Sequence, residues 1–440
     1  MTSMNTESST PKTSPEGLLR GIRKWDLVAV AINGIIGAGI FGLPAKVYAL
    51  IGTYSLIAFV ACAIVVTLII LCFAEVGSRF DETGGPYLYA REAFGPAVGF
   101  EVGWLSWLAR LSAFAANAKL MVSYLGVFWP GATAPGSRAI IISLVVLSLA
   151  SINFLGVRQA AIASDFFTIG KLIPLLLFIG AGLFFLKPQA FAFGPRPASG
   201  AFSQSVLLLI FAFTGFEMAG IPAGEVRDPR RNLPRALLIA IGVVATTYIL
   251  VQVVCVGTLP QLASSTKPLA DAAQNFMGTM GARIISAGAI ISIVGNLNIL
   301  VLAGSRLPFA FAEQRALPAF VARVHPRFFT PHVAIAITAT VMLVLTLKTS
   351  FVAALTISAI ARLVTYAVTC AALPVLRRSK RIAPALFRVR GGPIIAIAAL
   401  ILSAWLLANS TAKEMIQSLI AAAVGLLIYF SYRIYSSRAN

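Results

Sequence analysis

Ionisable side chains occur inside long apolar stretches of this sequence, where charged residues are costly. Four basic and three acidic residues lie in such stretches: Arg110, Lys119, Lys171, Arg362, Glu101, Asp165 and Glu217. An unpaired charge at the centre of a bilayer costs about 2.5 to 3.5 kcal/mol on insertion scales, so these side chains should face protein or water. We therefore expect substrate binding, ion coupling or buried ion pairs for most of them, whereas Lys119 and Glu101 lie nearer the ends of their span and could extend their charged groups to the interface.

Pairing along one helix does not neutralise these charges. Asp165 and Lys171 are six residues apart, about 240° around a helix, and Glu101 and Arg110 are nine apart, about 180°. Their partners must therefore come from other helices. A structural ion pair is the alternative to a functional role, for example between Lys171 and Glu217 or Asp165. The two intramembrane arginines and Asp165 could form such pairs or line an outward vestibule.

The apolar stretch AINGIIGAGIFGLPAK at residues 31–46 contains residue types that weaken a helix. Gly and Pro are less favourable than Ala in a helix interior by about 1 and 3 kcal/mol. The spacing recurs: four residues separate Gly37 from GLPA at 42–45, and four separate Gly215 from GIPA at 220–223. Two interrupted spans of opposite direction indicate an inverted-repeat transporter with a midplane site. The alternative is that the glycines only let helices pack closely.

Interruption at these glycines would free main-chain groups in the middle of the membrane. If the first span opens around Gly37, Ala38 and Gly39, its second half begins with unpaired N–H groups and a positive dipole end, which suit a carboxylate. If the other span opens near Gly215, the freed carbonyls of its first half can accept hydrogen bonds from an ammonium group. A zwitterion satisfies both ends at once.

The composition places the chain in a lipid bilayer. Its 440 residues are 58% hydrophobic and 11% charged, and the mean hydropathy is +0.89, which is too apolar for a soluble surface. Apolar stretches long enough to cross about 30 Å of hydrocarbon recur about twelve times. The predicted spans are 26–50, 54–77, 97–128, 138–156, 160–186, 202–223, 234–258, 281–308, 332–348, 351–375, 392–409 and 415–432. We expect an all-α membrane protein, because the backbone in lipid must satisfy its own hydrogen bonds.

A net charge of +20 could suggest nucleic-acid binding, but the basic residues lie in alternate loops rather than in one patch. With the N-terminus inside, about 23 Lys and Arg residues fall in cytoplasmic segments, about 8 in outer ones and about 4 in helices. This asymmetry predicts a multi-pass protein of the cytoplasmic (inner) membrane with both termini in the cytoplasm. We expect no nucleic-acid partner.

The connections between spans are short, so we predict one transmembrane domain. Residues 1–19 lack the apolar core of a signal peptide and should form a disordered cytoplasmic tail. Three cytoplasmic connections, at 79–96, 224–237 and 305–335, carry most of the loop motifs. The first and third mix aromatic and charged residues in short helical patches, which suits helices along the inner interface.

Other chemistries have little support in the sequence. All four cysteines (Cys62, Cys72, Cys255 and Cys370) fall in predicted spans, which favours buried packing over a disulfide or metal site. The two histidines, His325 and His332, lie in the third connection beside prolines, so no intramembrane histidine cluster is available. No Walker A motif and no spacing of nucleophile and base is evident. We expect neither a cofactor nor an enzyme.

Four blocks closely resemble the amino acid-polyamine-organocation family of permeases. They are GIIGAGIFGLPA, ETGGPYLYAREAFG, FAFTGFEMAGIPAGEVRDPRRNLPRA and GNLNILVLAGSRLPFAFAEQRALP. The resemblance implies a LeuT-type fold with a five-plus-five inverted repeat and discontinuous helices 1 and 6. The ten-helix core would cover residues 20–380, and helices 11 and 12 would follow at 381–440.

The resemblance also implies a substrate site. The family's Gly-Ser-Gly carboxylate motif corresponds to Gly37, Ala38 and Gly39, where alanine replaces the hydroxyl residue but the amides remain. The carbonyls that meet the substrate amino group correspond to Ile35, Phe211 and Thr214, beside Gly215. Phe211 also falls at the family's aromatic gate position.

Coupling residues follow from the same resemblance. Lys171, in FTIGKLIP, matches a helix 5 lysine that replaces the sodium site in sodium-independent members, and Ser292 would lie near it. Glu217 matches a helix 6 acid that is implicated in pH response in the related arginine/agmatine antiporter. Arg110 matches no general family feature.

The predicted function is sodium-independent secondary transport of amino acids by alternating access, as proton-coupled symport or as amino acid exchange. The alternatives are a polyamine or cationic amino acid antiporter and a non-transporting amino acid sensor on the same fold. The inferred pocket suits small or medium neutral side chains, whereas Glu217 would suit a cationic substrate and Arg110 an acidic one. The sequence leaves the oligomeric state open.

Overall fold

The computed structural model describes residues 18–126, 128–198, 200–265, 267–348, 351–408 and 412–439. Within these residues the elements are α-helices joined by short 3-10 turns and loops. The α-helices are α1 (Lys24–Ile35), α2 (Gly39–Ile51), α3 (Ser55–Gly77), α4 (Pro86–Phe94), α5 (Pro96–Leu125), α6 (Pro135–Leu155), α7 (Val157–Gly182), α8 (Ala201–Phe213), α9 (Pro229–Thr258), α10 (Pro268–Glu313), α11 (His332–Lys348), α12 (Phe351–Arg378), α13 (Gly392–Ala408) and α14 (Ala412–Ala439). The 3-10 turns are η1 (Gly52–Tyr54), η2 (Pro130–Thr133), η3 (Leu183–Phe185), η4 (Pro188–Phe191), η5 (Phe216–Gly220), η6 (Ala223–Glu225), η7 (Leu262–Ser264) and η8 (Ala319–Ala322).

Several of these helices are long and apolar enough to cross a membrane. In the described part of the chain six stretches meet that standard: Gly39–Gly77, Pro135–Leu155, Phe166–Phe185, Ala201–Gly220, Pro229–Thr258 and Pro268–Glu313. Three shorter apolar helices cover His332–Lys348, Gly392–Trp405 and Leu419–Ile434. The all-helical class is therefore confirmed, while the total of twelve spans stays a prediction.

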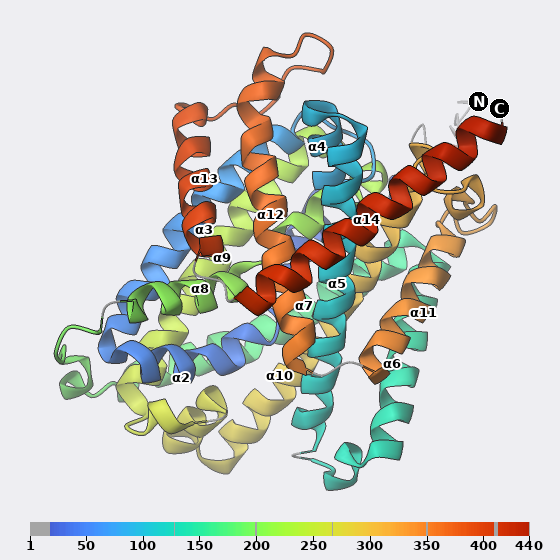
Figure 1. Cartoon of the computed structure of the whole chain (residues 1–440). Coiled ribbons are helices and arrows are strands. Elements are labelled where there is room, and N and C mark those ends of the chain that lie inside the picture. The colour runs from blue at the N-terminus through green and yellow to red at the C-terminus, as the bar shows by residue number, and fades with distance from the viewer. Residues whose placement is uncertain are drawn as a thin grey trace, which may run out of the picture.

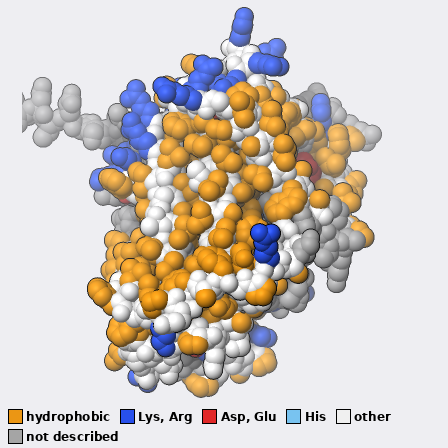
Figure 2. Space-filling model, turned by 90° about the vertical axis from the view of Figure 1, so that its left-hand side faces the viewer, with side chains coloured by type: hydrophobic (Ala, Val, Ile, Leu, Met, Phe, Trp, Pro, Cys, Tyr) orange, Lys and Arg blue, Asp and Glu red, His pale blue; other side chains and the backbone are white. Residues whose placement is uncertain are grey.

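The outer surface of the bundle is apolar, as a lipid-facing surface must be. Helix α7 exposes Phe166, Ile169, Ile173 and Leu176, a spacing of three to four residues that follows one face of a helix. Figure 2 shows apolar side chains over most of one side of the molecule, with Lys and Arg gathered mainly at its upper end. An exposed apolar surface of this extent suits contact with the hydrocarbon of a lipid bilayer.

The long helices run roughly along one axis, and the interrupted ones lie among them. In Figure 1, α3, α5, α9 and α12 run between the two ends of the bundle, while α2 lies across its lower left part. The helix α4, the connection between α12 and α13 and the carboxyl end of α14 share the upper end. The bundle thus has one basic end and encloses α1, which is buried from Val30 to Ile35.

Helix α10 differs most from its prediction, which placed a span at 281–308. It begins at Pro268, turns at Gly278 with φ of +66°, and continues to Glu313. Ser305 and Arg306, which the sequence analysis assigned to a connection, are therefore fully buried within a helix. The helix continues past Arg306 to Glu313. The charge of Arg306 can be buried there because it is paired with an acid described below.

The helix α4 is also less superficial than predicted. A helix in the first connection was expected to lie along the inner interface, but Tyr87, Leu88, Tyr89 and Ala90 are buried. Tyr87 packs edge-on against Phe311 of α10, with ring centroids 5.0 Å apart. The connection is therefore part of the packed bundle. Residues 1–17 of the predicted tail lie outside the described residues, whereas Leu18 is buried.

Candidate functional site

The first predicted interruption is present in the structure. The helix α1 ends at Ile35, residues 36–38 are not helical, and α2 begins at Gly39. The interruption lies one residue earlier than the expected Gly37-Ala38-Gly39 segment. Glycine allows close packing at this break, because a Cβ added to Gly37 would come within 3.3 Å of the Asn296 side chain. The α2 helix therefore starts in the interior of the bundle rather than at its edge.

The second predicted interruption is present at Gly215. The helix α8 ends at Phe213, Thr214 is extended (φ −77°, ψ 159°) and Gly215 has φ of +113°. Only glycine adopts such a positive φ without strain. The chain then continues as the short 3-10 turn η5 instead of a second α-helix, so the span predicted at 202–223 is helical only in its first half.

The two interruptions lie back to back. A Cβ added to Gly34 would come within 2.7 Å of Gly215 O, and a Cβ added to Gly215 would overlap Gly34 O. A Cβ added to Gly39 would lie 2.9 Å from Ala212 Cβ, so α2 also begins in close contact with α8. The two segments are far apart in the sequence. The small residues allow their freed main-chain groups to lie close together in the structure.

Lys171 and Ser292 hold the carbonyl end of α1. Lys171 Nζ donates to Ile36 O (2.5 Å), to Asn33 Oδ1 (2.5 Å) and to Asn33 O (3.3 Å). Ser292 Oγ, from α10, donates to the same Ile36 O over 3.3 Å. Both residues are fully buried. The predicted proximity of the lysine, the serine and the open helix is therefore observed, and the cation faces the negative end of the α1 dipole.

Asparagines complete this arrangement, and the sequence analysis did not single them out. Asn296 Nδ2 donates to Gly34 O (2.8 Å) and to Asn33 O (3.1 Å), while its Oδ1 accepts from Asn117. Asn33 in turn donates to Gly295 O. An asparagine in an apolar span indicates a buried polar contact, because its amide needs a hydrogen-bond partner. The motif GNLN at 295–298 carried that signal.

Tyr248 joins the two interrupted segments and was likewise missed. Its hydroxyl lies 3.3 Å from both Ile35 O and Ala212 O, one carbonyl from each segment. Its ring packs edge-on against Phe213 at 4.9 Å. The carbonyl predicted to meet the substrate amino group, Ile35 O, therefore already faces a hydroxyl, but a carbonyl oxygen has a second lone pair to offer.

The amino end of α2 is the part of the site best suited to an anion. No side chain among the described residues caps α2 at Ala38, and both Ala38 and Gly39 are partly exposed. An uncapped helix start presents N–H groups and the positive dipole end. On the facing segment Phe211 is partly exposed, and its carbonyl accepts from Thr214 N and Oγ1.

Glu217 is the centre of a buried polar cluster beside the second interruption. Its Oε2 accepts from Tyr366 OH (2.8 Å) and from Gly215 N (2.9 Å). Its Oε1 lies 3.6 Å from Arg110 Nη2 and 3.5 Å from Arg362 Nη1. Both predicted intramembrane arginines thus meet the predicted acid, as the requirement for partners on other helices implied.

Of the remaining predicted charges, Glu101 and Lys119 lie away from the two interruptions. The side chain of Asp165 lies outside the described residues. Both carboxylate oxygens of Glu101 are buried, with no hydrogen-bond partner among the described residues, and Oε2 faces Gly425 of α14. Lys119 is partly exposed toward the end of α5. The seven predicted charges therefore separate into four at the interruptions and three elsewhere or undescribed.

Comparison with known proteins shows which family the chain is similar to. The family model described as "Amino acid permease" matches residues 22–430. The chain is 26% identical to the branched-chain amino acid permease BcaP of Bacillus subtilis, over 97% of this chain and 95% of that protein. It is 31% identical to the serine/threonine exchanger SteT of Bacillus subtilis, over 73% and 75%. It is 32% identical to the human Asc-type amino acid transporter 1, over 72% and 64%.

The chain belongs to the amino acid permease family. The family resemblance drawn from the four sequence blocks is thus confirmed, and with it the transport class and the membrane setting. The relatives are permeases and transporters rather than enzymes. In this permease Lys171 lies at the first interruption and Glu217 at the second.

A further buried ion pair of the permease lies outside the predicted site. Arg306 donates through Nε to Glu225 Oε1 (2.7 Å) and through Nη2 to Glu225 Oε2 (3.0 Å), and both side chains have zero exposure. Glu225 O also accepts from Ile22 N, which ties the segment before α1 to η6. The sequence analysis missed this pair because it placed both residues in exposed connections.

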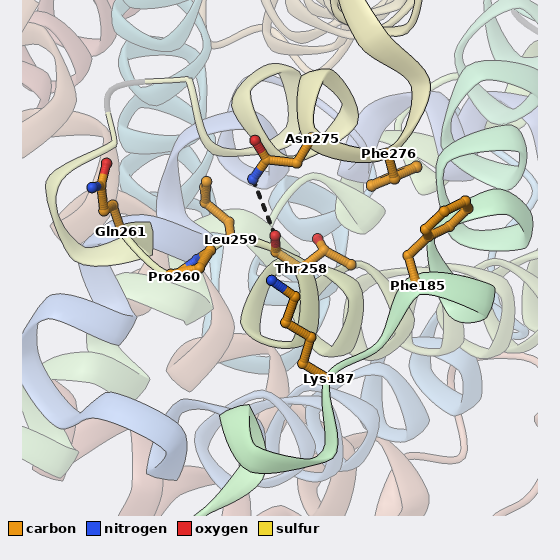
Figure 3. Close-up of a pocket in the computed structure, with 8 residues that line it drawn as sticks. All are labelled: Phe185, Lys187, Thr258, Leu259, Pro260, Gln261, Asn275 and Phe276. Atoms are coloured by element: carbon orange, nitrogen blue, oxygen red, sulfur yellow. Dashed lines mark hydrogen bonds between the residues drawn. The ribbon is translucent and has the colours of Figure 1, made fainter.

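A cavity of the permease lies apart from the interruptions. It has a volume of about 480 Å³ between the ends of α7 and α9 and the start of α10 (Figure 3). It is lined by Phe185, Lys187, Thr258, Leu259, Pro260, Gln261, Asn275 and Phe276. Asn275 donates to Thr258 O across its edge. The cavity shares no residue with the groups that hold the two open helices.

Proposed function

We propose that this permease moves amino acids across the cytoplasmic membrane by alternating access, without sodium. The observation that carries the proposal is the juxtaposition of two open helices, one offering the amides after Ala38 and the other the carbonyls before Gly215. An α-amino acid has a carboxylate for the first and an ammonium for the second. Recognition of the groups common to all amino acids leaves the side chain to set specificity.

The substrate contacts in this proposal follow the predicted residues. The carboxylate binds the amides of Gly37, Ala38 and Gly39, and the ammonium group binds the carbonyls of Ile35, Phe211 and Thr214. Gly215 supplies the turn after α8, the helix that carries the Phe211 carbonyl. Binding at interrupted helices near the bilayer midplane is the arrangement used by transporters with inverted repeats.

The proposed architecture is a LeuT-type core of ten spans followed by two more. In it α1 and α2 form the first span, α8 and η5 form the sixth, and α13 and α14 are the last two. Supporting this, α4, the α12–α13 connection and the end of α14 share the basic end of the bundle (Figures 1 and 2). By the positive-inside rule that end faces the cytoplasm.

Lys171 is the proposed substitute for a coupling cation. Its ammonium group binds the carbonyl of Ile36 and both oxygens of Asn33, and so provides a fixed positive charge at the open end of α1. Ser292 shares that carbonyl. A lysine that exchanges a proton during the cycle gives symport, and one that stays charged gives amino acid exchange.

Flux into proteoliposomes tests the proposal. Purified full-length protein is reconstituted, and uptake of each of a panel of labelled amino acids is measured under three conditions: an inward proton gradient, internal amino acid, and an inward sodium gradient. Uptake driven by the proton gradient supports symport, and uptake that needs internal amino acid supports exchange. Binding of an amino acid without flux in any condition would replace the carrier with a sensor.

A further inference from the structure

The cluster around Glu217 carries more positive than negative charge. Among the described side chains it consists of one carboxylate and two guanidinium groups, Arg110 and Arg362. The three side chains have relative exposures of 2%, 1% and 7%. Buried charges inside a membrane protein are normally paired, because desolvation of an unmatched charge is costly. One positive charge in this cluster therefore lacks a counter-charge.

Glu217 has little capacity left to neutralise both arginines. Its Oε2 already accepts hydrogen bonds from Tyr366 OH and Gly215 N. Its Oε1 is 3.5 to 3.6 Å from the nearest nitrogen of Arg362 and of Arg110, longer than the 2.7 to 2.9 Å typical of a charge-assisted hydrogen bond. Both guanidinium groups therefore face the acid without being tightly bound to it.

Arg110 also retains unused donors. Its Nη1 donates to Ser106 O, but Nε and Nη2 are buried with no hydrogen-bond partner among the described residues. Arg362 Nε reaches only a neutral group, Ser358 Oγ, over 3.3 Å. A buried guanidinium with two unsatisfied nitrogens is costly by itself and is well suited to a planar or small anion.

The position of the cluster connects it to the proposed substrate site. Glu217 caps the amide of Gly215, the residue that ends the second interruption, and Thr214 precedes it directly. The arginines come from α5 and α12, two helices that pack against each other, and both reach Glu217. Lys171 does not contribute a competing charge, because its hydrogen bonds go to the carbonyl end of α1.

We propose that Arg110 and Arg362 form a subsite for a negatively charged group that travels with, or as part of, the substrate. The matching ligands are an amino acid with a carboxylate side chain, such as L-glutamate or L-aspartate, and a neutral amino acid accompanied by a small inorganic anion. Either brings the one negative charge that the cluster lacks. This inference rests on the proposed function, since it concerns the same site.

Transport in two anion backgrounds distinguishes the two sources. Uptake of labelled L-glutamate and of its neutral isostere L-glutamine is measured in proteoliposomes containing the full-length protein, in chloride and in the bulky anion gluconate. A side-chain subsite predicts at least tenfold more uptake of L-glutamate than of L-glutamine in gluconate. A co-ion subsite predicts at least tenfold less L-glutamine uptake in gluconate than in chloride.

Variants of the two arginines link the effect to this cluster. R110Q and R362Q each keep hydrogen-bonding capacity but remove one positive charge. Each should raise, at least tenfold, either the KM for L-glutamate or the chloride concentration needed for half-maximal L-glutamine uptake. R110K, which keeps the positive charge, should show a smaller increase than R110Q. R378Q, at an exposed position on the last turn of α12, is the matched control and should not change either value. Unfolding temperatures of all variants separate folding defects from binding defects.

The outcomes are distinct. Chloride-independent L-glutamine uptake, with L-glutamate neither transported nor competing, overturns the subsite and leaves the transport proposal intact. An equal rise in KM for L-glutamate and L-glutamine in R110Q and R362Q also overturns it. Absence of flux for every amino acid tested overturns the transport proposal and the subsite with it.

Discussion

The side chain of Lys171 stabilises the open end of α1, next to the proposed substrate site. Its ammonium group replaces the main-chain donors that the carbonyls of Asn33 and Ile36 lose where α1 ends. Asn33 and Ile36 are fully buried, so their carbonyls need hydrogen-bond donors from the protein. A neutral residue would leave them to Ser292 and Asn296 alone among the described donors.

We predict that K171A abolishes most transport. Hydrogen bonds to a charged group contribute about 1.5 to 3 kcal/mol, so removing them should reduce initial uptake by about tenfold or more. R378A, which changes an exposed basic residue, should transport like the unchanged protein. Both are measured by initial uptake in proteoliposomes at matched protein content. Equal activity of the two variants would remove the role proposed for Lys171.

The bidentate pair of Arg306 and Glu225 gives a prediction about stability. R306A leaves an uncompensated carboxylate in a fully buried site, and breaking such a pair typically costs about 3 to 5 kcal/mol. The unfolding temperature of the purified protein in detergent should therefore fall clearly. The double variant R306Q with E225Q removes both charges and should be more stable than R306A. A double variant that is less stable than R306A would contradict the argument.

At the level of elements, the two interruptions depend on glycine at particular positions. The φ of +113° at Gly215 and the lack of space for a Cβ against Gly34 both exclude a side chain. Gly42 lies inside α2 with no atom within 4 Å of an added Cβ. These two glycines therefore have different roles, although both belong to the repeated spacing that the sequence analysis recognised.

We predict that G215A impairs both folding and transport, whereas G42A does not. A non-glycine residue in a strained backbone region costs about 1 to 3 kcal/mol, and overlap with Gly34 O adds to this cost. In G42A the gain in helix propensity is about 0.5 to 1 kcal/mol. The measurements are the unfolding temperature and initial uptake. Normal uptake by G215A would show that the two segments do not need their close contact.

The whole molecule combines an apolar band with one strongly basic end (Figure 2). Loops rich in Lys and Arg tend to stay in the cytoplasm, so we predict that the basic end faces the cytoplasm. The connection between α12 and α13 lies at this end, and η2, between α5 and α6, lies at the other (Figure 1). The four native cysteines are buried, which leaves both ends open to labelling of introduced thiols.

We predict opposite labelling of cysteines introduced at the two ends. In whole cells a membrane-impermeant maleimide should label A134C, at an exposed position after η2, and should not label K380C, at an exposed position after α12. Inside-out vesicles should reverse the result. The unchanged protein serves as the background control. Labelling of K380C from outside would invert the proposed orientation and with it the direction of each half-helix.

The linear sequence determined the membrane class, the all-helical fold, the family and the two interruptions. Those features depend on local composition: apolar length, helix-breaking residues and charge in the connections. The charged residues of the site were also recognisable, because a charge in an apolar span is conspicuous wherever its partner lies.

The pairing of those charges needed the packed structure. Glu217 joins α5 and α12 through Arg110 and Arg362, three residues from distant parts of the chain. Tyr248 and Asn296 look like ordinary polar residues in the sequence, yet they supply donors to the open end of α1. Arg306 was assigned to a connection, and only the packed structure brings it to its partner Glu225 on another segment. Hydrogen bonds and ion pairs between helices depend on distance in space, and residue spacing along one chain does not encode that distance.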